Sequence, residues 1–274
     1  MSKMKLWISV MGPLLLLPML SGCGTEPSWD KEEISAPSAR ILSDEVKAEW
    51  TVGEAGPSDS AGGRRTIRVA IEGKDGKPIE SFETNHEKLL HLMVISKDLS
   101  YFNHIHPEYK GNGAFEIAND FPSGGDYRLI ADFKPTGGDT MTKMAWVKLD
   151  GASAAPVPVF PDAVLDKTFA GNRVKLTVDG LAANKETTLA FSIADERTGR
   201  PVTDLEPYLG AIGHVVVLTE DGERYVHVHA EEGQGTGPEA LFETTFPKSG
   251  IYKIWAQFQR HGEVFTASFV VNVP

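Results

Sequence analysis

Short apolar or alternating stretches, separated by Gly, Pro, Asn and Asp, run along most of the chain. No segment of about 12 residues has a convincing 3.6-residue period, so the pattern predicts strands and not helices. Strands this short, with turn residues between them, are typical of antiparallel sandwiches. The predicted strands lie at 66–71, 89–95, 127–133 and 145–149 in the first half and at 173–178, 188–193, 214–218, 225–229, 251–259 and 264–273 in the second.

The second half of the chain repeats the first. Residues 78–108 align without gaps on residues 201–231, and three of the 8 identities in these 31 positions are histidines. A second block aligns 121–133 with 246–258, and in both copies a Gly-x-Tyr precedes an apolar strand, as in the tyrosine corner of immunoglobulin-like sandwiches. We therefore predict an all-β chain of two tandem immunoglobulin-like β-sandwiches. The predicted boundaries are 40–150 for repeat 1, 151–161 for a linker rich in Ala and Pro, and 162–274 for repeat 2.

The N-terminal segment, residues 1–22, resembles a bacterial lipoprotein signal peptide. Two lysines precede an apolar stretch at 6–20 that two prolines interrupt, and Leu-Ser-Gly-Cys follows. The stretch is too short and too interrupted for a membrane-spanning helix. The resemblance implies cleavage before Cys23, a lipid anchor on Cys23 and a flexible tether over 23–39. We expect an extracytoplasmic chain on the outer face of the cytoplasmic membrane, or at an outer membrane if the host has one. An uncleaved membrane anchor is the alternative, and it leaves the chain on the same side.

Charge and cysteine content exclude several classes of protein. The chain has 27 Lys and Arg against 38 Asp and Glu, a net charge of −11. Without the two lysines of the signal segment the balance is 25 − 38 = −13, so a nucleic-acid or anionic-membrane surface has no electrostatic support. The single cysteine, Cys23, excludes an intramolecular disulfide, a thiolate zinc site and a cysteine nucleophile in the folded part. Any chemistry must therefore use His, Met, carboxylate or hydroxyl groups.

Hairpin arithmetic places the histidines of repeat 2 together. An Asp-Gly pair at 221–222 lies between two apolar runs, which predicts a two-residue type I′ turn. With this turn, cross-strand partners have residue numbers that sum to 443, so His214 lies opposite His229. His227 shares their face because it lies two positions from His229.

Repeat 1 contains the same arrangement around the Asp-Leu pair at 98–99. The residue numbers of cross-strand partners there sum to 197, which places His91 opposite His106 and Met93 opposite His104. Asp-Leu is a weaker turn signal than Asp-Gly, and a slip of one residue would separate the side chains. The predicted face carries three imidazoles and one thioether.

These two faces predict one metal site in each repeat. The ligand sets are His91, Met93, His104 and His106 in repeat 1 and His214, His227 and His229 in repeat 2. Imidazole nitrogens favour copper first and zinc second, and the thioether favours Cu(I). Because only neutral imidazole binds metal, we expect affinity to fall below about pH 6. The alternative is that the histidines pack across each hairpin without metal.

Other polar residues near the hairpins have different predicted roles. Asp98 and Asp221 are expected to hydrogen-bond to the backbone of their turns. His86 and His261 have no counterpart in the other repeat and are expected at the surface. Glu108 and its counterpart two positions after His229 are candidates for an oxygen ligand or for orienting an imidazole.

Each repeat combines a strand that opens with His, an Asp turn, a His-x-His and a Phe-Pro-x-x-Gly-x-Tyr, over residues 76–133 and 199–258. This unit resembles the YtkA-like or FixH-like extracytoplasmic domains of bacteria. The resemblance implies an immunoglobulin-like or cupredoxin-like sandwich and a role in metal handling. Met93 is Val in the second copy, so repeat 2 differs from repeat 1 in its ligand set.

Three functional classes follow from these features. The leading hypothesis is a membrane-anchored copper-binding protein for metal buffering, resistance or delivery to a membrane transporter or metalloprotein. The alternative is a metal-free surface lipoprotein whose sandwiches bind a protein partner, with structural or pH-sensing histidines. We do not expect an enzyme, because no Gly-x-Ser-x-Gly, phosphate loop or His-Glu-x-x-His is present. A blue-copper electron carrier is excluded because its site needs a Cys thiolate.

Overall fold

The structure is a computed structural model that describes residues 41–54 and 61–274. The predicted signal peptide, Cys23 and the tether lie outside the described residues. Apart from a 3-10 turn at Ser43–Glu45 (η2), the named elements are β-strands, as the sequence pattern predicts. Within the described ranges, no helix is long and apolar enough to cross a membrane.

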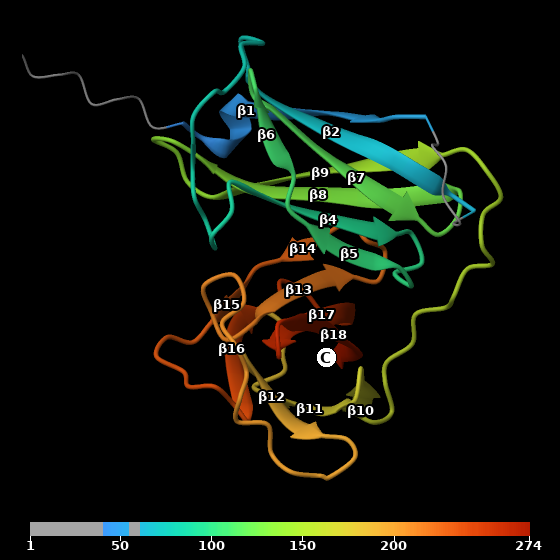
Figure 1. Cartoon of the computed structure of the whole chain (residues 1–274), viewed down its shortest axis with the longest axis vertical. Helices are drawn as coiled ribbons and strands as arrows, with labels where there is room; N and C mark the ends of the chain where they lie inside the picture. The colour runs from blue at the N-terminus through green and yellow to red at the C-terminus, as the bar shows by residue number, and fades with distance from the viewer. Residues whose placement is uncertain (1–40, 55–60) are drawn as a thin grey trace, which may run out of the picture. The chain divides into compact units, whose positions relative to one another are not determined.

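Repeat 1 forms two antiparallel sheets (Figure 1). One has the strand order β1-β2-β7-β6, and the other has β3-β8-β4-β5 with β9 paired to β8. The strands are β1 (Val46–Val52), β2 (Gly63–Gly73), β3 (Phe82–Glu83), β4 (Leu90–Ser96), β5 (Phe102–Ile105), β6 (Glu108–Gly111), β7 (Ala114–Phe121), β8 (Gly125–Pro135) and β9 (Met141–Leu149).

Repeat 2 also forms two antiparallel sheets, with the orders β10-β11-β12-β16-β15 and β14-β13-β17-β18. Its strands are β10 (Asp166–Phe169), β11 (Asn172–Asp179), β12 (Glu186–Asp195), β13 (His214–Thr219), β14 (Tyr225–Val226), β15 (Val228–Ala230), β16 (Glu239–Thr245), β17 (Gly250–Arg260) and β18 (Glu263–Val273). The two tandem immunoglobulin-like sandwiches predicted from the sequence are confirmed.

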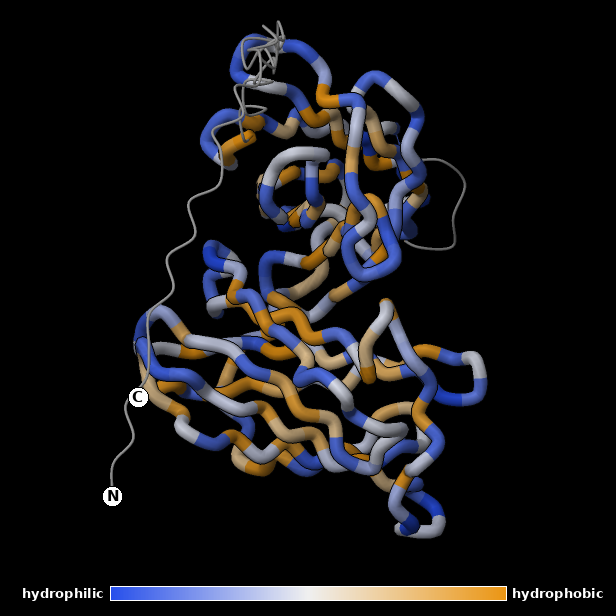
Figure 2. Tube along the Cα trace, turned by 90° about the vertical axis from the view of Figure 1, so that its left-hand side faces the viewer, coloured by the Kyte–Doolittle hydropathy of each residue, from blue (hydrophilic) through white to orange (hydrophobic). Residues whose placement is uncertain are grey.

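Each sandwich has its own apolar core between its sheets, and Figure 2 shows apolar and polar positions interspersed along the strands. The predicted tyrosine corner is present in both repeats. The Tyr127 hydroxyl donates to the Ser123 carbonyl at 2.9 Å, and the Tyr252 hydroxyl donates to the Lys248 carbonyl at 2.7 Å. Both tyrosines are buried, so these bonds satisfy hydroxyls that would otherwise lack a partner.

The central strands β4 and β13 are buried on both faces. In β4, Leu92 and its alternate neighbours belong to the core of repeat 1, whereas Met93 and Ile95 belong to a third apolar cluster outside that core. In β13, Val217 lies in the core of repeat 2, whereas Val216 lies in the same third cluster. Because successive side chains of a strand point to opposite faces, the outer faces of these two strands pack against each other.

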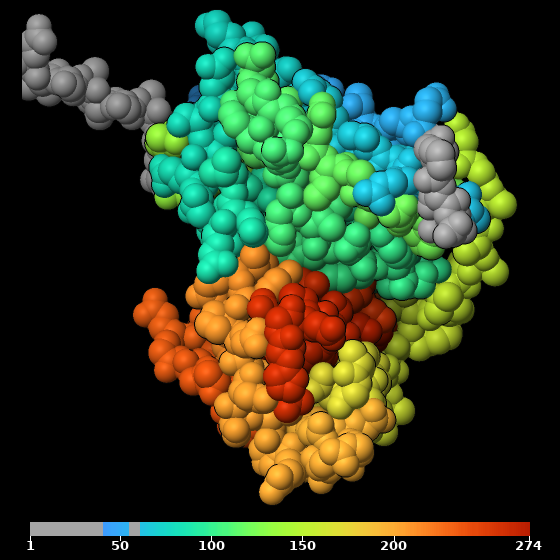
Figure 3. All heavy atoms as spheres, viewed as in Figure 1, coloured from blue at the N-terminus to red at the C-terminus, as the bar shows by residue number. Residues whose placement is uncertain are grey.

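This third cluster is the apolar part of the contact between the repeats. Its members are Met93, Ile95, Leu99 and Ile130 from repeat 1 and Val216, Leu218 and Trp255 from repeat 2. The ring of Phe102 stacks on Trp255, with centroids 4.9 Å apart and planes 12° apart. In Figure 3 the green atoms of repeat 1 lie directly against the orange and red atoms of repeat 2. The outer faces of β4 and β13 are therefore covered, each by the other repeat.

The predicted register of the repeat 1 hairpin is confirmed from Leu92 to Ile95, although the turn differs and the pairing ends before His91 and His106. Met93 pairs with His104, and every pair between β4 and β5 sums to 197. The loop is longer than two residues, because Ser96 still bonds to Tyr101 and Leu99 adopts the left-handed conformation with φ 57°. Asp98 accepts bonds from Ser100, as its predicted turn role requires.

In repeat 2 the register is correct only near the turn. Val217 pairs with Val226, and their residue numbers sum to 443 as predicted. Asp221-Gly222, however, forms part of a four-residue loop that is closed by the hydrogen bond from Thr219 N to Arg224 O. Asp221 accepts a bond from the backbone N of Glu223, as expected of a turn residue. The type I′ turn predicted at Asp221-Gly222 is wrong, because only Gly222 has a positive φ.

The predicted pairing of His214 with His229 is wrong. After Val226 the chain leaves β13 and crosses to the other sheet, where His229 pairs with Glu243 of β16. The hydroxyl of Thr244, also in β16, donates to the His227 carbonyl at 2.6 Å and holds the crossing. The three histidines of repeat 2 therefore do not share one hairpin face.

Candidate metal centre

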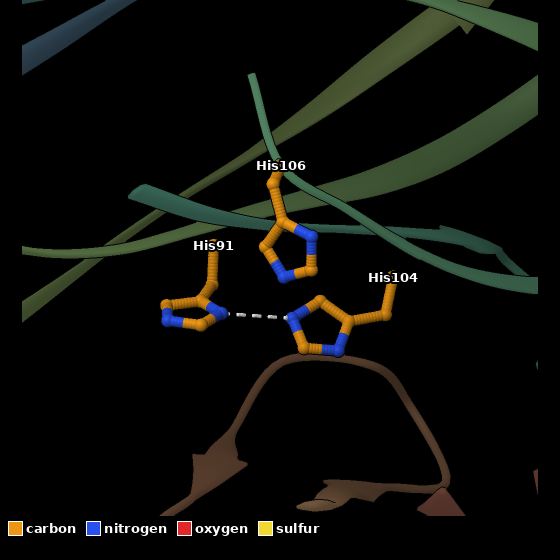
Figure 4. Close-up of side chains that lie close together, drawn as sticks. All are labelled: His91, His104 and His106. Carbon is orange, nitrogen blue, oxygen red and sulfur yellow. Dashed lines mark hydrogen bonds between the residues drawn. The ribbon is translucent and has the colours of Figure 1, made fainter. Parts of the chain in front are cut away.

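Three histidines of repeat 1 converge as one cluster. His91 comes from β4, His104 from β5, and His106 follows β5 directly. One ligand nitrogen from each lies within 4.8 Å of the others (Figure 4). His91 is 1% exposed and His104 7% exposed, while His106 is half-buried. Within the described ranges, this is the one group of three or more His, Cys, Asp or Glu residues with the spacing of metal ligands.

Hydrogen bonds on the far side of two rings determine which nitrogens carry protons. His91 Nε2 lies 2.9 Å from the carbonyl oxygen of Asn85, which can only accept, so Nε2 carries the proton. His104 Nδ1 lies 2.8 Å from Oε1 of Gln257, whose Nε2 donates to Thr266 Oγ1. With Gln257 Oε1 as its acceptor, His104 Nδ1 carries the proton, and both neutral rings then turn their lone pairs to the inside of the cluster.

These two lone pairs face each other. His91 Nδ1 and His104 Nε2 are 3.1 Å apart, at hydrogen-bond distance, but with these two tautomers neither nitrogen carries a proton. His106 Nε2 is buried without a hydrogen-bond partner. Two ligand nitrogens at 2.0–2.1 Å from a tetrahedral ion are about 3.3 Å apart, close to the separation found here. An ion bound by these nitrogens would remove the repulsion and satisfy the unpartnered atom.

Burial keeps the imidazoles in the form that binds metal. Removal from water lowers the pKa of His91 to about 4 and that of His106 to about 4. The pKa of His104 is also lowered well below its ordinary value, by burial first and then by the neighbouring histidines. Since only the neutral ring offers a lone pair, the site is ready for a cation at neutral pH.

A family model described as "Domain of unknown function (DUF8832)" matches the chain twice, over residues 43–151 and 167–274. The chain belongs to this family. The two matches support a tandem immunoglobulin-like protein. They do not support the predicted membership of the YtkA-like or FixH-like families. No curated protein matches the chain.

Solved structures with a similar fold have low identity to this DUF8832 protein. FdeC, an adhesin of Escherichia coli, is 16% identical at a TM-score of 0.27, and the match covers 85% of this chain and 65% of that one. Invasin, a bacterial integrin-binding protein, is 11% identical at a TM-score of 0.26, with coverages of 82% and 39%. A titin immunoglobulin tandem is 11% identical at a TM-score of 0.22, with coverages of 84% and 96%. Scores this low support no functional inference.

The DUF8832 repeats do not carry one histidine site each. His214, predicted as a ligand in repeat 2, lies against the histidines of repeat 1. Its ring is 4.8 Å from that of His104 and 5.7 Å from that of His91, measured between centroids. Burial, followed by the charges of its histidine neighbours, lowers the pKa of His214 to about 3. The two predicted sites are therefore replaced by one cluster at the contact between the repeats.

The remaining predicted ligands lie apart from the buried triad. His227 and His229 are exposed and their rings stack 6.3 Å apart, while His227 Nε2 lies 3.3 Å from the Thr142 hydroxyl. Met93 lies opposite His104 as predicted, but its side chain belongs to the apolar cluster between the repeats. Glu108, a candidate for an oxygen ligand or for orienting an imidazole, is exposed and forms an ion pair with Lys110.

Several residues near the site were missed by sequence analysis. Gln257 and Asn85 orient two of the imidazoles, and His86, expected only at the surface, also contacts the cluster. Asp132 of β8 pairs with His91 and is 6% exposed, and burial raises its pKa to about 7. Asp132 could have been noticed in the sequence, because it is a charged residue within the apolar stretch predicted as a strand at 127–133.

Proposed function

We propose that this DUF8832 protein binds one transition-metal ion through His91, His104 and His106, where its two sandwiches meet. Copper is the first choice and zinc the second, because a site of three neutral imidazoles without thiolate suits both, and the affinity order of divalent ions favours Cu(II). The protein acts as a binding protein for buffering, resistance or delivery and not as an enzyme. It works outside the cytoplasm, anchored by a lipid on Cys23.

One observation carries this proposal: His91 Nδ1 and His104 Nε2 lie 3.1 Å apart, while the outer nitrogen of each ring already has its own partner. A structural histidine pair would share a proton, one ring donating and the other accepting. Here the outer nitrogens already donate to Asn85 and Gln257, in the pattern that orients metal-binding imidazoles in known sites. This pattern supports a cation as the missing partner.

A binding role is also supported by the position of the site. His91 and His104 are buried between β-sheets, which leaves little room for a substrate beside the ion. A membrane anchor would hold the ion near a transporter or a metalloprotein that takes it up. The buried site would protect the ion from other ligands until transfer.

Competitive metal titration tests the proposal. The full chain in mild detergent is titrated with Cu(I), Cu(II) and Zn(II) against chelators of known affinity. We expect one tight equivalent, which His104→Ala removes and His227→Ala retains. His261→Ala is the matched control, because His261 is exposed and pairs with Asp204 away from the cluster.

The other outcomes of the titration are also informative. Loss of a second equivalent in His227→Ala would restore the hypothesis of one site in each repeat. Absence of tight binding by the natural sequence would overturn the proposal and leave a metal-free lipoprotein that binds a protein partner.

A further inference from the structure

An acidic pocket opens beside the buried histidines. It has a volume of about 480 Å³, and its walls include His86 of repeat 1 and His229 of repeat 2. Three carboxylate residues also line it, Glu206, Glu231 and Glu232. A concave, negatively charged surface raises the local concentration of cations, and two imidazoles offer nitrogen ligands there.

His86 connects this pocket to the buried site. Its ring centroid is 6.1 Å from that of His91 and 5.9 Å from that of His214. His86 itself is exposed, whereas His214 is half-buried and His91 is buried. The imidazoles thus form a continuous series from the solvent to the triad.

His86 has a left-handed backbone conformation that is shared by both repeats. It lies in a tight turn closed by two bonds between Asn85 and Lys88, with φ 45°. Left-handed backbone is uncommon for residues other than Gly, and among these Asn, Asp and His adopt it most often. The corresponding turn of repeat 2 has the buried apolar residue Leu209 at this position. Leu209 is left-handed too, with φ 55°, so the turn is the same in both repeats and repeat 1 differs in placing an exposed imidazole on the pocket where repeat 2 has a buried apolar side chain.

His229 lines the same pocket as His86. It also lines a second pocket, of about 540 Å³, together with His227 and the carboxylate residues Glu186 and Glu243. His227 and His229 are exposed and stacked, and no third nitrogen or carboxylate completes a metal triad with them among the described residues. These residues therefore suit a weak, transient contact with an ion better than a permanent site.

We propose that His86 and His229 form an uptake site for the metal ion, and that His86 passes the ion to the buried triad. This inference rests on the proposed function of the triad. In each step a metal–nitrogen bond to one neutral imidazole forms as a bond to water or to the previous imidazole breaks. The ion keeps its oxidation state, and no proton is transferred.

Loading kinetics test the uptake site. Cu(I) is presented on a coloured chelator, and the loss of colour gives the loading rate, while a colourless, stronger chelator gives the release rate. We use His86→Asn, because Asn tolerates left-handed backbone and should keep the turn. Both rates should fall about tenfold, the scale of guided association, and the dissociation constant should stay the same.

The matched control is His261→Asn. His261 is also an exposed histidine with left-handed backbone, φ 54°, but it lies outside the cluster. Its loading and release rates should equal those of the natural sequence. A second test, Glu231→Gln with Glu232→Gln, should slow loading mainly at low ionic strength, because it removes charge from the pocket.

Two results would overturn the uptake site. Loading of His86→Asn at the natural rate would show that the ion takes another route. A weaker equilibrium affinity with an unchanged loading rate would make His86 a ligand of the bound state. Both results differ from failure of the proposed function, in which the natural sequence itself would not bind Cu(I).

Discussion

His104 Nδ1 lies 2.8 Å from Oε1 of Gln257, a residue 153 positions further along the chain and in the other repeat. The ring that turns its lone pair to the candidate site is thus oriented by the opposite sandwich. Gln257 is itself held by its bond to Thr266. The candidate site as it stands therefore depends on both repeats and their contact.

Replacing the orienting group should weaken metal binding. Gln257→Ala removes the acceptor for His104 Nδ1–H, so that the ring can rotate or exchange its protonated nitrogen. We expect an affinity loss of about 10–100-fold, the usual effect of losing such an outer partner. Gln257→Glu retains an acceptor and should keep most of the affinity. Equal affinities for Gln257→Ala and the natural sequence would disprove the orienting role.

The contact between the repeats should contribute to stability in its own right. Phe102→Ala removes the ring stacked on Trp255 but leaves both sandwich cores intact. We expect a loss of about 2–3 kcal/mol and a separation of the unfolding into two calorimetric transitions. Phe160→Ala is the control, because Phe160 is 72% exposed. A single transition shifted no more than in the control would show that the repeats do not depend on this contact.

The sequence predicted local features of this fold and missed the contact between its halves. The tyrosine corners and the register of Met93 with His104 depend on turns and on two-residue alternation, which are local. The stretch at 89–95 is apolar at odd and even positions alike, which is a signal of burial on both faces. It does not identify the second repeat as the covering surface, because that depends on how two distant sheets fit.

The same distinction applies to the candidate site. The proximity of His91 and His104 follows from one hairpin, so the pattern of the sequence predicts it. His214 and Gln257 join them from sequence positions more than a hundred residues away, and no spacing rule connects such positions. His229 was misplaced because its strand changes sheets after Val226, where the alternating pattern continues without a break.

The pKa values of the buried histidines predict how stability depends on pH. In the unfolded chain each has a pKa near its ordinary value of about 6.5, whereas folding lowers the pKa to about 4 for His91 and His106 and about 3 for His214. Between these values the unfolded chain binds more protons, so the metal-free protein should lose stability as the pH falls from about 6.5 towards 4. Each group contributes at most about 1.4 kcal/mol per pH unit.

Urea unfolding of the metal-free protein at pH 7.5, 6 and 5 measures this loss. His214→Gln should reduce the slope, because one of the groups that must take up a proton on unfolding is gone. Bound metal should persist below the pH of about 6 that unperturbed imidazoles would set, since the folded rings stay neutral to lower pH. Constant stability from pH 7.5 to 5 would contradict the buried, neutral state of the cluster.

Met93 tests whether sulfur takes part in the site. Its side chain lies in the apolar cluster between the repeats, so packing accounts for its burial. Met93→Leu conserves volume and apolar character, and we expect stability within about 1.5 kcal/mol and unchanged affinity for Cu(I) and Cu(II). A loss restricted to Cu(I) would instead add the thioether to the ligand set, because soft sulfur discriminates between the two ions.

Asp132 gives a test in which stability and binding move in opposite directions. It pairs with His91 across β4 and β8, and burial raises its pKa to about 7. Folding raises the pKa of this carboxyl, whereas it lowers the pKa of the histidines. The effect of Asp132 on stability is therefore opposite in sign: the stability of the folded chain falls as the pH rises from about 4 to about 7. Asp132→Asn should therefore stabilise the metal-free protein at pH 8, by at most about 4 kcal/mol, as measured by urea unfolding. The same variant should weaken metal binding, since a buried cation loses a nearby negative charge. A variant that is less stable at pH 8 and binds metal normally would show that Asp132 acts only through its bond from Thr142.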